Sequence, residues 1–230
     1  MASRREADRL IAGGAVLVNG RRPPPEGRLV DPEHDRVTVA GRDVTPPRGH
    51  RYLALNKPVG AIVSAADRAG RPTVFDLTRE HAAGHRLFAV GRLDVDTSGL
   101  LLLTDDGELS NRLLHPRHKV TKEYEALVTG LPDERDLRSL RAGVDLDDGR
   151  TQPAEADVIG RARDGSTLVR LVLSEGRNRQ VRRMLAAVGH PVKQLRRTAF
   201  GPVRLGRLRE GDVRRLREPE IQALREAAGL

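Results

Sequence analysis

The chain contains no cysteine and no tryptophan, and its aromatic residues are 2 tyrosines and 3 phenylalanines. Without cysteine it forms no disulfide, thiolate metal site or cysteine nucleophile, which is typical of a cytoplasmic protein. No apolar run approaches the roughly 18 residues of a transmembrane helix. The N-terminus also lacks the apolar segment of a signal peptide. We therefore expect a soluble cytoplasmic protein with no membrane partner.

Basic residues are abundant, with 41 Lys and Arg against 32 Asp and Glu and a net charge of +9 at pH 7. This surplus favours a polyanionic partner, nucleic acid before a membrane. The alternative is that a GC-rich genome has raised the number of arginines without any function. Charge alone therefore indicates a class of partner and nothing finer.

The first 47 residues read as a small unit. A capping box at Ser3–Glu6 predicts a helix that runs to about Ala12. Residues 15–18 and 36–39 have the apolar character of short strands. The segment 45–49 is rich in Pro and Gly and is a plausible linker. The predicted domains are 1–47 and 48–230.

The larger part of the chain is richer in strands than in helices. The predicted strands are 51–56, 61–64, 87–93, 100–104, 122–129, 154–159, 166–173 and 192–199. The predicted helices are 107–114, 133–142, 178–188 and 219–228. The two kinds of element do not alternate regularly, so we predict an α+β fold with a mixed, mainly antiparallel central sheet and flanking helices.

Asp94 is the first candidate for a catalytic group. It lies in the sequence GRLDVDTSGLLLLT, between the apolar runs 87–90 and 100–103. Short apolar runs bounded by Gly and Asp are typical of buried strands joined by a tight loop. A carboxylate in such a loop is held by a rigid scaffold and remains accessible to a ligand.

Three patterns resemble other sites and are discounted. Residues 94–105 imitate a calcium loop, but the flanks are strand-like and the last ligand is Asp. The sequence DTSG at 96–99 resembles part of an aspartic protease, but no second copy occurs in the chain. His81 and His85 have helical spacing without a third ligand. We therefore predict no metal site.

Residues 175–185, EGRNRQVRRML, predict an amphipathic basic helix. Val181, Met184 and Leu185 share its apolar face, Arg179 and Arg183 fall opposite, and Arg182 lies at the border. A border arginine can direct its guanidinium into a partly buried pocket. The alternative is an ordinary helix with a solvated basic face.

Tyr124 follows Lys122 and Glu123 on a predicted strand. Tyrosine is scarce in this chain, so a phenol at this position is a candidate site residue. The alternative is a strand residue that packs its ring and hydrogen-bonds its hydroxyl.

Several motifs together resemble the ribosomal RNA pseudouridine synthases of the RsuA/RluB family, in particular the large-subunit RluB-like enzymes. These motifs, which occur along almost the whole chain, are LNKPVG (55–60), GRLD (91–94), LLTDDGEL (102–109), HPR (115–117), KEY (122–124), EGRNRQVRRM (175–184) and GHPV (189–192). The resemblance implies the pseudouridine synthase catalytic fold and an isomerase that converts uridine in ribosomal RNA to pseudouridine. It implies no cofactor, because substrate and product are isomers.

The resemblance also implies roles for three residues. Asp94 is the catalytic carboxylate, which attacks the flipped nucleoside or takes a proton from it. Arg182 is its charge partner. Tyr124 stacks on the uracil and could help to remove the C5 proton.

The N-terminal module resembles the S4 RNA-binding domain, but the helix that normally precedes Ser3 is missing, so we expect a partial module. The expected RNA-binding residues are Arg92, Lys57, Arg177, Asn178, Arg179, Arg183, Lys193, Arg196, Arg197, Arg4 and Arg5. The expected partner of this monomer is a stem-loop of ribosomal RNA, 23S before 16S, either free or in a precursor particle. A non-catalytic ribosome-assembly factor with the same fold is the alternative.

Overall fold

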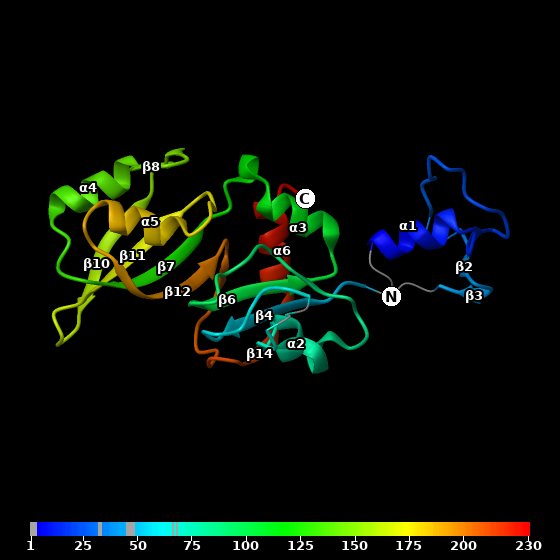
Figure 1. Ribbon diagram of the computed structural model, residues 1–230, viewed down its shortest axis with the longest axis horizontal. Helices are drawn as coiled ribbons and strands as arrows, with labels where there is room; N and C mark the ends of the chain where they lie inside the picture. Colours follow the sequence, from blue (N-terminus) through cyan, green and yellow to red (C-terminus); the bar gives the residue numbers. More distant parts are fainter. Residues whose placement is uncertain (1–3, 32–33, 45–48, 66, 68) are drawn as a thin grey trace. The chain divides into compact units, whose positions relative to one another are not determined.

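The computed structural model describes residues 4–31, 34–44, 49–65, 67 and 69–230 of the chain. Its internal contacts divide the chain into two units, Met1–Gly49 and His50–Leu230 (Figure 1). The predicted cap at Ser3 and most of the predicted linker lie outside the described residues. Among the described residues, no helix combines the length and the apolar character needed to cross a membrane.

The first unit contains one helix and a small antiparallel sheet. Helix α1 is Arg4–Ala12, and the strands β1, β2 and β3 pair in that order. Their bounds are β1 Val16–Val18, β2 Val37–Val39 and β3 Arg42–Asp43. The helix and the first two strands lie where the sequence predicts them.

The second unit is built on a nine-stranded sheet in the order β10-β11-β7-β12-β6-β4-β14, with β13 beside β12 and β5 beside β6. The bounds of its strands are β4 Tyr52–Lys57, β5 Phe88–Ala89, β6 Thr97–Thr104, β7 Lys122–Val128, β10 Glu155–Arg161, β11 Thr167–Leu173, β12 Val192–Phe200, β13 Val203–Arg204 and β14 Val213–Arg215. Every pair is antiparallel except β6 with β12. The predicted fold class is confirmed.

Helices cover both faces of this sheet. They are α2 Val74–Ala82, α3 Gly107–Leu114, α4 Glu134–Ala142, α5 Gln180–Ala187 and α6 Glu218–Ala227, with a 3₁₀ turn η1 at Pro116–His118 and a separate hairpin of β8 (Asp145–Leu146) and β9 (Gly149–Arg150). Helix α2 was not predicted; it begins with a capping box between Thr73 and Asp76. The predicted strand 61–64 is wrong, because only an isolated bridge at Ile62 forms there.

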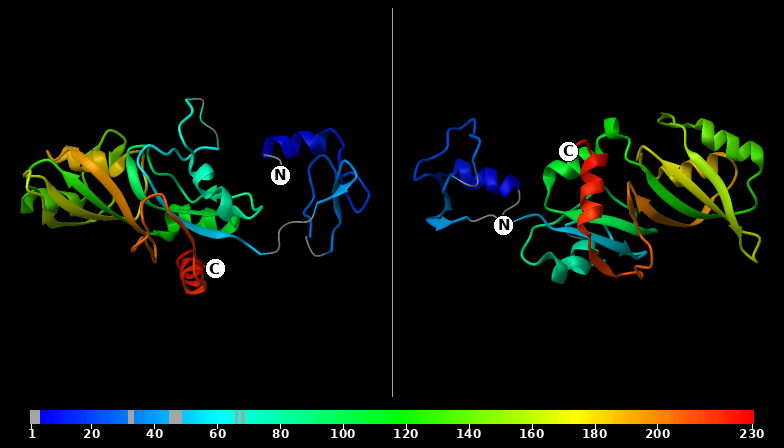
Figure 2. Two further views of the ribbon diagram at one scale, coloured as in Figure 1. Left: turned by 90° about the horizontal axis from the view of Figure 1, so that it is seen from below. Right: turned by 180° about the vertical axis from the view of Figure 1, so that it is seen from behind.

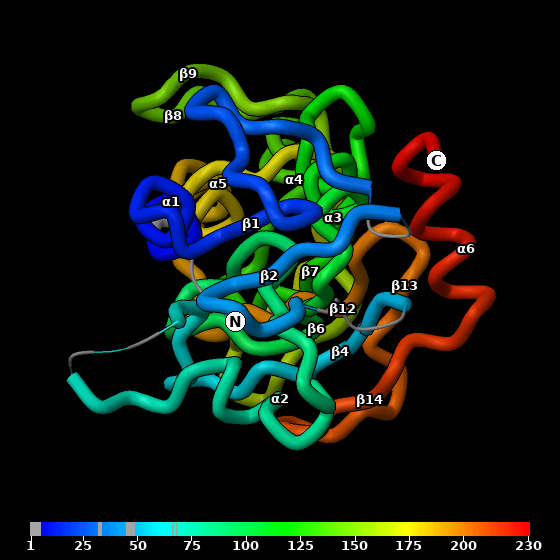
Figure 3. Tube along the Cα trace, turned by 90° about the vertical axis from the view of Figure 1, so that its right-hand side faces the viewer, coloured from blue at the N-terminus to red at the C-terminus, as the bar shows by residue number. Residues whose placement is uncertain are grey.

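Strand β6 contains four consecutive leucines and does not alternate between apolar and polar residues, because it is buried on both faces of the sheet. Leu100 and Leu102 pack with residues of α3 and α6, whereas Leu101 and Leu103 pack with residues of α2. Figure 2 (left) shows α2 and α6 on opposite sides of this part of the sheet, and Figure 3 shows α2 close to β14. A strand buried on both faces needs apolar residues at every position.

The parallel pairing of β6 with β12 joins the two halves of the sheet. Gly99 lies opposite Arg197 in this register. Its φ is +106°, and a Cβ at this position would overlap the backbone carbonyl and amide of Arg197. Glycine is required here both for its backbone conformation and for the close approach of the strands.

We predict that Gly99→Ala destabilises the fold more than Gly149→Ala. Gly149 has a similar φ of +99°, but no atom lies near its added Cβ. Both variants should incur backbone strain of about 1–3 kcal/mol, and only Gly99→Ala should add an overlap that separates the strands. Urea unfolding followed by circular dichroism measures both. Equal losses of stability would show that the close approach is unimportant.

Candidate active site

A cavity of about 410 Å³ opens beside the β6–β12 junction. Its walls come from the loop before β6, from η1, from the loop before α5, and from one face of β7 and β12. The sequence-predicted residues that line it are Arg92, Asp94, Tyr124, Arg177, Asn178, Arg179 and Arg197. The fold therefore brings together candidates that are up to about a hundred residues apart in the sequence.

Asp94 lies in the loop between β5 and β6, with 36% of its side chain exposed. The loop is fixed by backbone hydrogen bonds: the Thr97 amide donates to the Asp94 carbonyl, and the Gly60 amide donates to the Val95 carbonyl. The Arg179 guanidinium lies 3.8 Å from the Asp94 carboxylate. This arrangement leaves an anchored carboxylate that faces the cavity with a positive charge beside it.

The predicted pairing of Arg182 with Asp94 is corrected by the structure. Arg182 instead donates to the backbone carbonyl of Asp96, at 2.8 Å, and lies 3.2 Å from the Asp96 carboxylate. Arg179 contacts both acids, with hydrogen bonds of 3.2 and 3.0 Å to Asp96. The predicted helix began at residue 178, but α5 begins at Gln180, and Arg179 precedes it with a left-handed φ of 47°. This turns Arg179 away from the solvated helix face where the sequence pattern placed it.

These contacts act on the charge of Asp96. Burial tends to raise the pKa of this carboxyl group, but the hydrogen bond from Arg179 and the charge of Arg182 outweigh burial. The net effect is a pKa below the ordinary value. Asp96 is therefore a stable anion that holds both arginines beside the Asp94 loop.

Lys57 is not a surface contact for RNA as the sequence suggested. Its side chain is fully buried, and its ammonium donates to the carbonyls of Pro58 and Ala61 at 2.9 and 2.8 Å. Burial lowers the pKa of Lys57 to about 8, although Asp96 and Asp94 act in the opposite direction. The residue supports the neighbouring loop from within the core.

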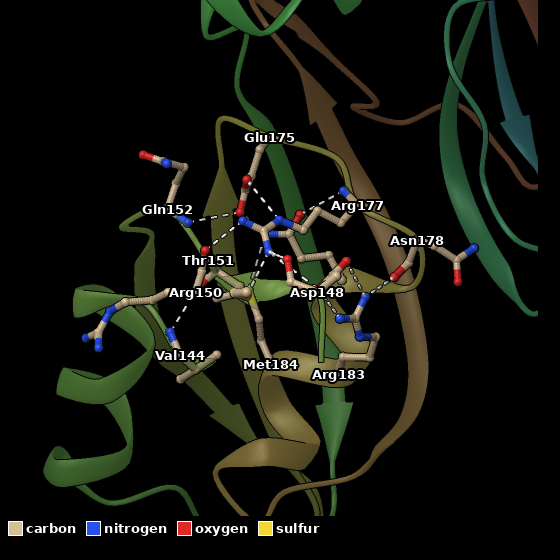
Figure 4. Close-up of polar contacts among 12 residues, drawn as sticks. Val144, Asp148, Arg150, Thr151, Gln152, Glu175, Arg177, Asn178, Arg183 and Met184 are labelled. Carbon is tan, nitrogen blue, oxygen red and sulfur yellow. Dashed lines mark hydrogen bonds and ion pairs between the residues drawn. The ribbon is translucent and has the colours of Figure 1, made fainter. Parts of the chain in front are cut away.

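Arg177 and Arg183 are engaged with the β8–β9 hairpin, as Figure 4 shows. Arg177 donates to the carbonyls of Asp148, Gly149 and Arg150 at 3.2, 2.8 and 2.6 Å. Arg183 donates to the Asp148 carboxylate and to the Asn178 carbonyl. Two arginines expected to contact phosphates thus fix the loop that carries Arg179.

Arg197 is buried instead of lying at the surface with Arg196. Its side chain lies on the face of β12 that lines the cavity, opposite Tyr124 of β7. Its Nε donates to the Leu100 carbonyl at 2.8 Å, and its guanidinium carbon lies 5.3 Å from the centre of the Phe200 ring. Arg196 is exposed, on the opposite side of β12.

Lys122, which was not among the predicted site residues, also lines the cavity. It precedes Tyr124 by two positions on β7, so both side chains point to the same face. The two-residue spacing from Tyr124 on a predicted strand was the sequence signal that could have identified Lys122 as a site residue. Burial, and secondarily the charge of Arg197, lowers the pKa of Lys122 to about 8.

Lys193 does not line the cavity. Lys193 is paired with Asp164 at 3.2 Å and with the Ser166 hydroxyl at 2.6 Å. Arg4 and Arg5 belong to α1 of the first unit, and their side chains are outside the described part of the structure. Within the described ranges, no group of three or more His, Asp or Glu side chains could hold a metal ion.

Comparison with known proteins identifies the family. A model of the family described as RNA pseudouridylate synthase matches residues 51–187. An uncharacterised RNA pseudouridine synthase of Mycobacterium tuberculosis is 49% identical over 233 residues, covering 100% of this chain and 91% of that protein. Ribosomal large subunit pseudouridine synthase B of Bacillus subtilis is 42% identical over 229 residues, covering 99% of this chain and 92% of that protein.

A solved structure gives the same result in three dimensions. The crystal structure of a pseudouridylate synthase superimposes with a TM-score of 0.69 at 35% identity, covering 96% of this chain and 94% of that one. The sequence-predicted family is confirmed by sequence and by structure. The chain belongs to the RNA pseudouridine synthases, the isomerases that convert uridine in RNA to pseudouridine.

Proposed function

We propose that this enzyme modifies a uridine of ribosomal RNA, in the 23S RNA, and that Asp94 is its catalytic carboxylate. One observation carries the assignment. Of the two carboxylates that line the cavity, Glu175 accepts hydrogen bonds from Gln152, Arg177 and Gln180. Asp94 has one ion-pair contact within the described chain, with Arg179 at 3.8 Å. Asp94 is therefore the acid that remains available to a substrate.

The choice of ribosomal RNA rests on relatives. The Bacillus subtilis protein that covers nearly the whole chain is named for the large ribosomal subunit. The net charge of +9 suits a polyanionic substrate. Loops of RNA are favoured targets because less stacking must be broken there.

The reaction follows from the position of Asp94. The target nucleotide leaves its stack and enters the cavity, which costs a few kcal/mol. Asp94 attacks the nucleoside or takes a proton from it, the N1–C1′ bond breaks, and its electron pair stays on the uracil. The base turns and a C5–C1′ bond forms; at this point the bond from Asp94 to the sugar breaks, or Asp94 returns the proton that it took. The C5 proton then leaves and N1 takes a proton. Tyr124 stacks on the base, and Arg182 acts through Asp96 to hold the loop.

RNA is held by exposed groups around the cavity and by the first unit. Arg92 and Asn178 line the cavity from exposed positions, and Arg196 is exposed on β12. The first unit, with Arg4 and Arg5 on its helix, serves as an S4-like RNA-binding module at 1–47, and residues 48–230 form the catalytic domain. The enzyme acts as a cytoplasmic monomer on a stem-loop or on a precursor particle.

We predict that Asp94→Asn abolishes modification without abolishing RNA binding. The amide keeps the shape of the side chain and removes its charge, so the rate should fall by about 1,000-fold or more. Pseudouridines are mapped by carbodiimide-adduct primer extension in ribosomal RNA from a deletion strain complemented with each variant. The matched control is Asp147→Asn, in the exposed turn of the β8–β9 hairpin, which should restore modification.

Two results of this pseudouridine mapping would contradict the proposal. A signal restored at the target uridine by Asp94→Asn would refute the catalytic assignment. If deletion changed no uridine in either ribosomal RNA, the proposed substrate would be wrong.

We also predict that Arg182 and Arg196 affect different steps. Arg182→Ala should slow single-turnover conversion more than it weakens binding, because it releases Asp96 and the loop that carries Asp94. Arg196→Ala should weaken binding and reduce the salt slope of log K by about 1, because it removes one phosphate contact. Binding titrations at two salt concentrations, with single-turnover rates, separate the two effects. The reverse pattern would contradict this division.

A further inference from the structure

The sheet side of the cavity contains two cations that have no counter-ion among the described residues. The Lys122 ammonium and the Arg197 guanidinium lie 5.6 and 5.3 Å from the centre of the same Phe200 ring. Among the described residues, neither forms an ion pair with a carboxylate. Arg197 is only 3% exposed, and its Nη2 is a buried donor without a hydrogen-bond partner. The Thr97 hydroxyl, in the wall of the same cavity, is also buried and unpartnered.

This arrangement is unfavourable in the free protein. Buried donors without acceptors and neighbouring like charges both destabilise a fold. The acid that faces Lys122 is Glu175, and its charge acts to raise the pKa of the lysine. Its oxygens, however, already accept hydrogen bonds from Gln152, Arg177 and Gln180. A ligand oxygen that carries negative charge would satisfy Lys122 and Arg197 together.

The position of the two cations favours the base of the RNA over its phosphates. Phosphates remain joined to the rest of the RNA, so they stay at the mouth of the cavity with exposed groups such as Arg92. Asp94, which meets the ribose, is 36% exposed, whereas Arg197 is 3% exposed. The base extends inward from the ribose and therefore reaches the buried Arg197, with the half-buried Lys122 on the same face of the sheet. Uracil offers two carbonyl oxygens to such donors.

We propose that Lys122 and Arg197 bind a carbonyl oxygen of the everted uracil and stabilise the negative charge that the base gains when its glycosidic bond breaks. The proposal rests on the proposed function, in which the N1–C1′ bond breaks with its electron pair left on the uracil. That charge spreads over the two carbonyl oxygens. Donors that bind the anion more strongly than the neutral base lower the barrier to cleavage. No further reactant is needed.

The first test replaces the lysine. Lys122→Met should reduce the single-turnover rate on unmodified 23S RNA transcript by about 100-fold, the usual loss for one donor to a developing anion. Binding should change by less than about 3-fold, and Lys122→Arg should recover most of the rate. Lys119→Met is the matched control, because Lys119 is exposed three positions earlier and does not line the cavity. Arg197 is kept intact, since its Nε bond to Leu100 belongs to the sheet.

A second test identifies the contact with the base. Synthetic stem-loops carry 2-thiouridine or 4-thiouridine at the mapped target, because sulfur accepts hydrogen bonds poorly. One of the two should slow the wild-type enzyme by about 10-fold or more and should slow Lys122→Met by less than about 2-fold. The same thio effect in both enzymes, or a wild-type rate in Lys122→Met, would overturn the proposal.

The pH profile gives an independent readout. Lys122 must be protonated, so the wild-type rate should fall as pH rises through about 8, whereas Lys122→Arg should stay active. Burial also lowers the pKa of Lys57 to about 8, so a loss of rate in the wild-type enzyme alone could come from either lysine. The comparison of wild type with Lys122→Arg separates the two lysines. An alkaline loss of rate that persists unchanged in Lys122→Arg would contradict the role of Lys122. A wild-type enzyme that modifies no ribosomal RNA would instead refute the proposed function.

Discussion

The parallel contact between β6 and β12 is the constraint on which the site depends. It joins a half-sheet covered by α2, α3 and α6 to one covered by α4 and α5. The loop that carries Asp94 enters β6 at this junction, and Arg197 lies on the facing strand. Gly99 permits the close approach, because any side chain there would meet the backbone of β12. The cavity therefore combines side chains from both halves of the sheet.

The charged side chains around this junction form two groups, an ion-pair network around Asp96 and the cations Lys122 and Arg197 on the sheet side of the cavity. Asp96 holds Arg179 and Arg182 at one wall, and the hairpin bonded to Arg177 and Arg183 fixes the loop between them. Asp94 remains partly exposed beside this network, Arg197 is buried and Lys122 is half-buried, and neither cation forms an ion pair with a described carboxylate. In the proposed reaction Asp94 meets the ribose and the two cations meet the base, an arrangement that suits a step that first separates charge between sugar and uracil and then recombines them.

The sequence predicted the family, the fold class and most of the elements, because its motifs occur in order and its apolar runs are strong. It missed α2, whose capping box is its clearest local signal, and it lengthened β5, of which only Phe88–Ala89 forms a strand. Lys57 could not be placed from its sequence, because only tertiary structure shows the two carbonyls that bind its ammonium in the core. The directions of Arg179 and Arg182 depend on a helix that starts later than its periodicity indicates.

The most direct measurement is a structure of the Asp94→Asn enzyme bound to its RNA stem-loop. We expect an everted uridine with its C1′ within about 3.5 Å of the residue 94 side chain. We also expect a uracil carbonyl oxygen within about 3.2 Å of the Lys122 ammonium. A target uridine that remains stacked in the RNA, or a uracil bound away from the β7–β12 face, would contradict both proposals.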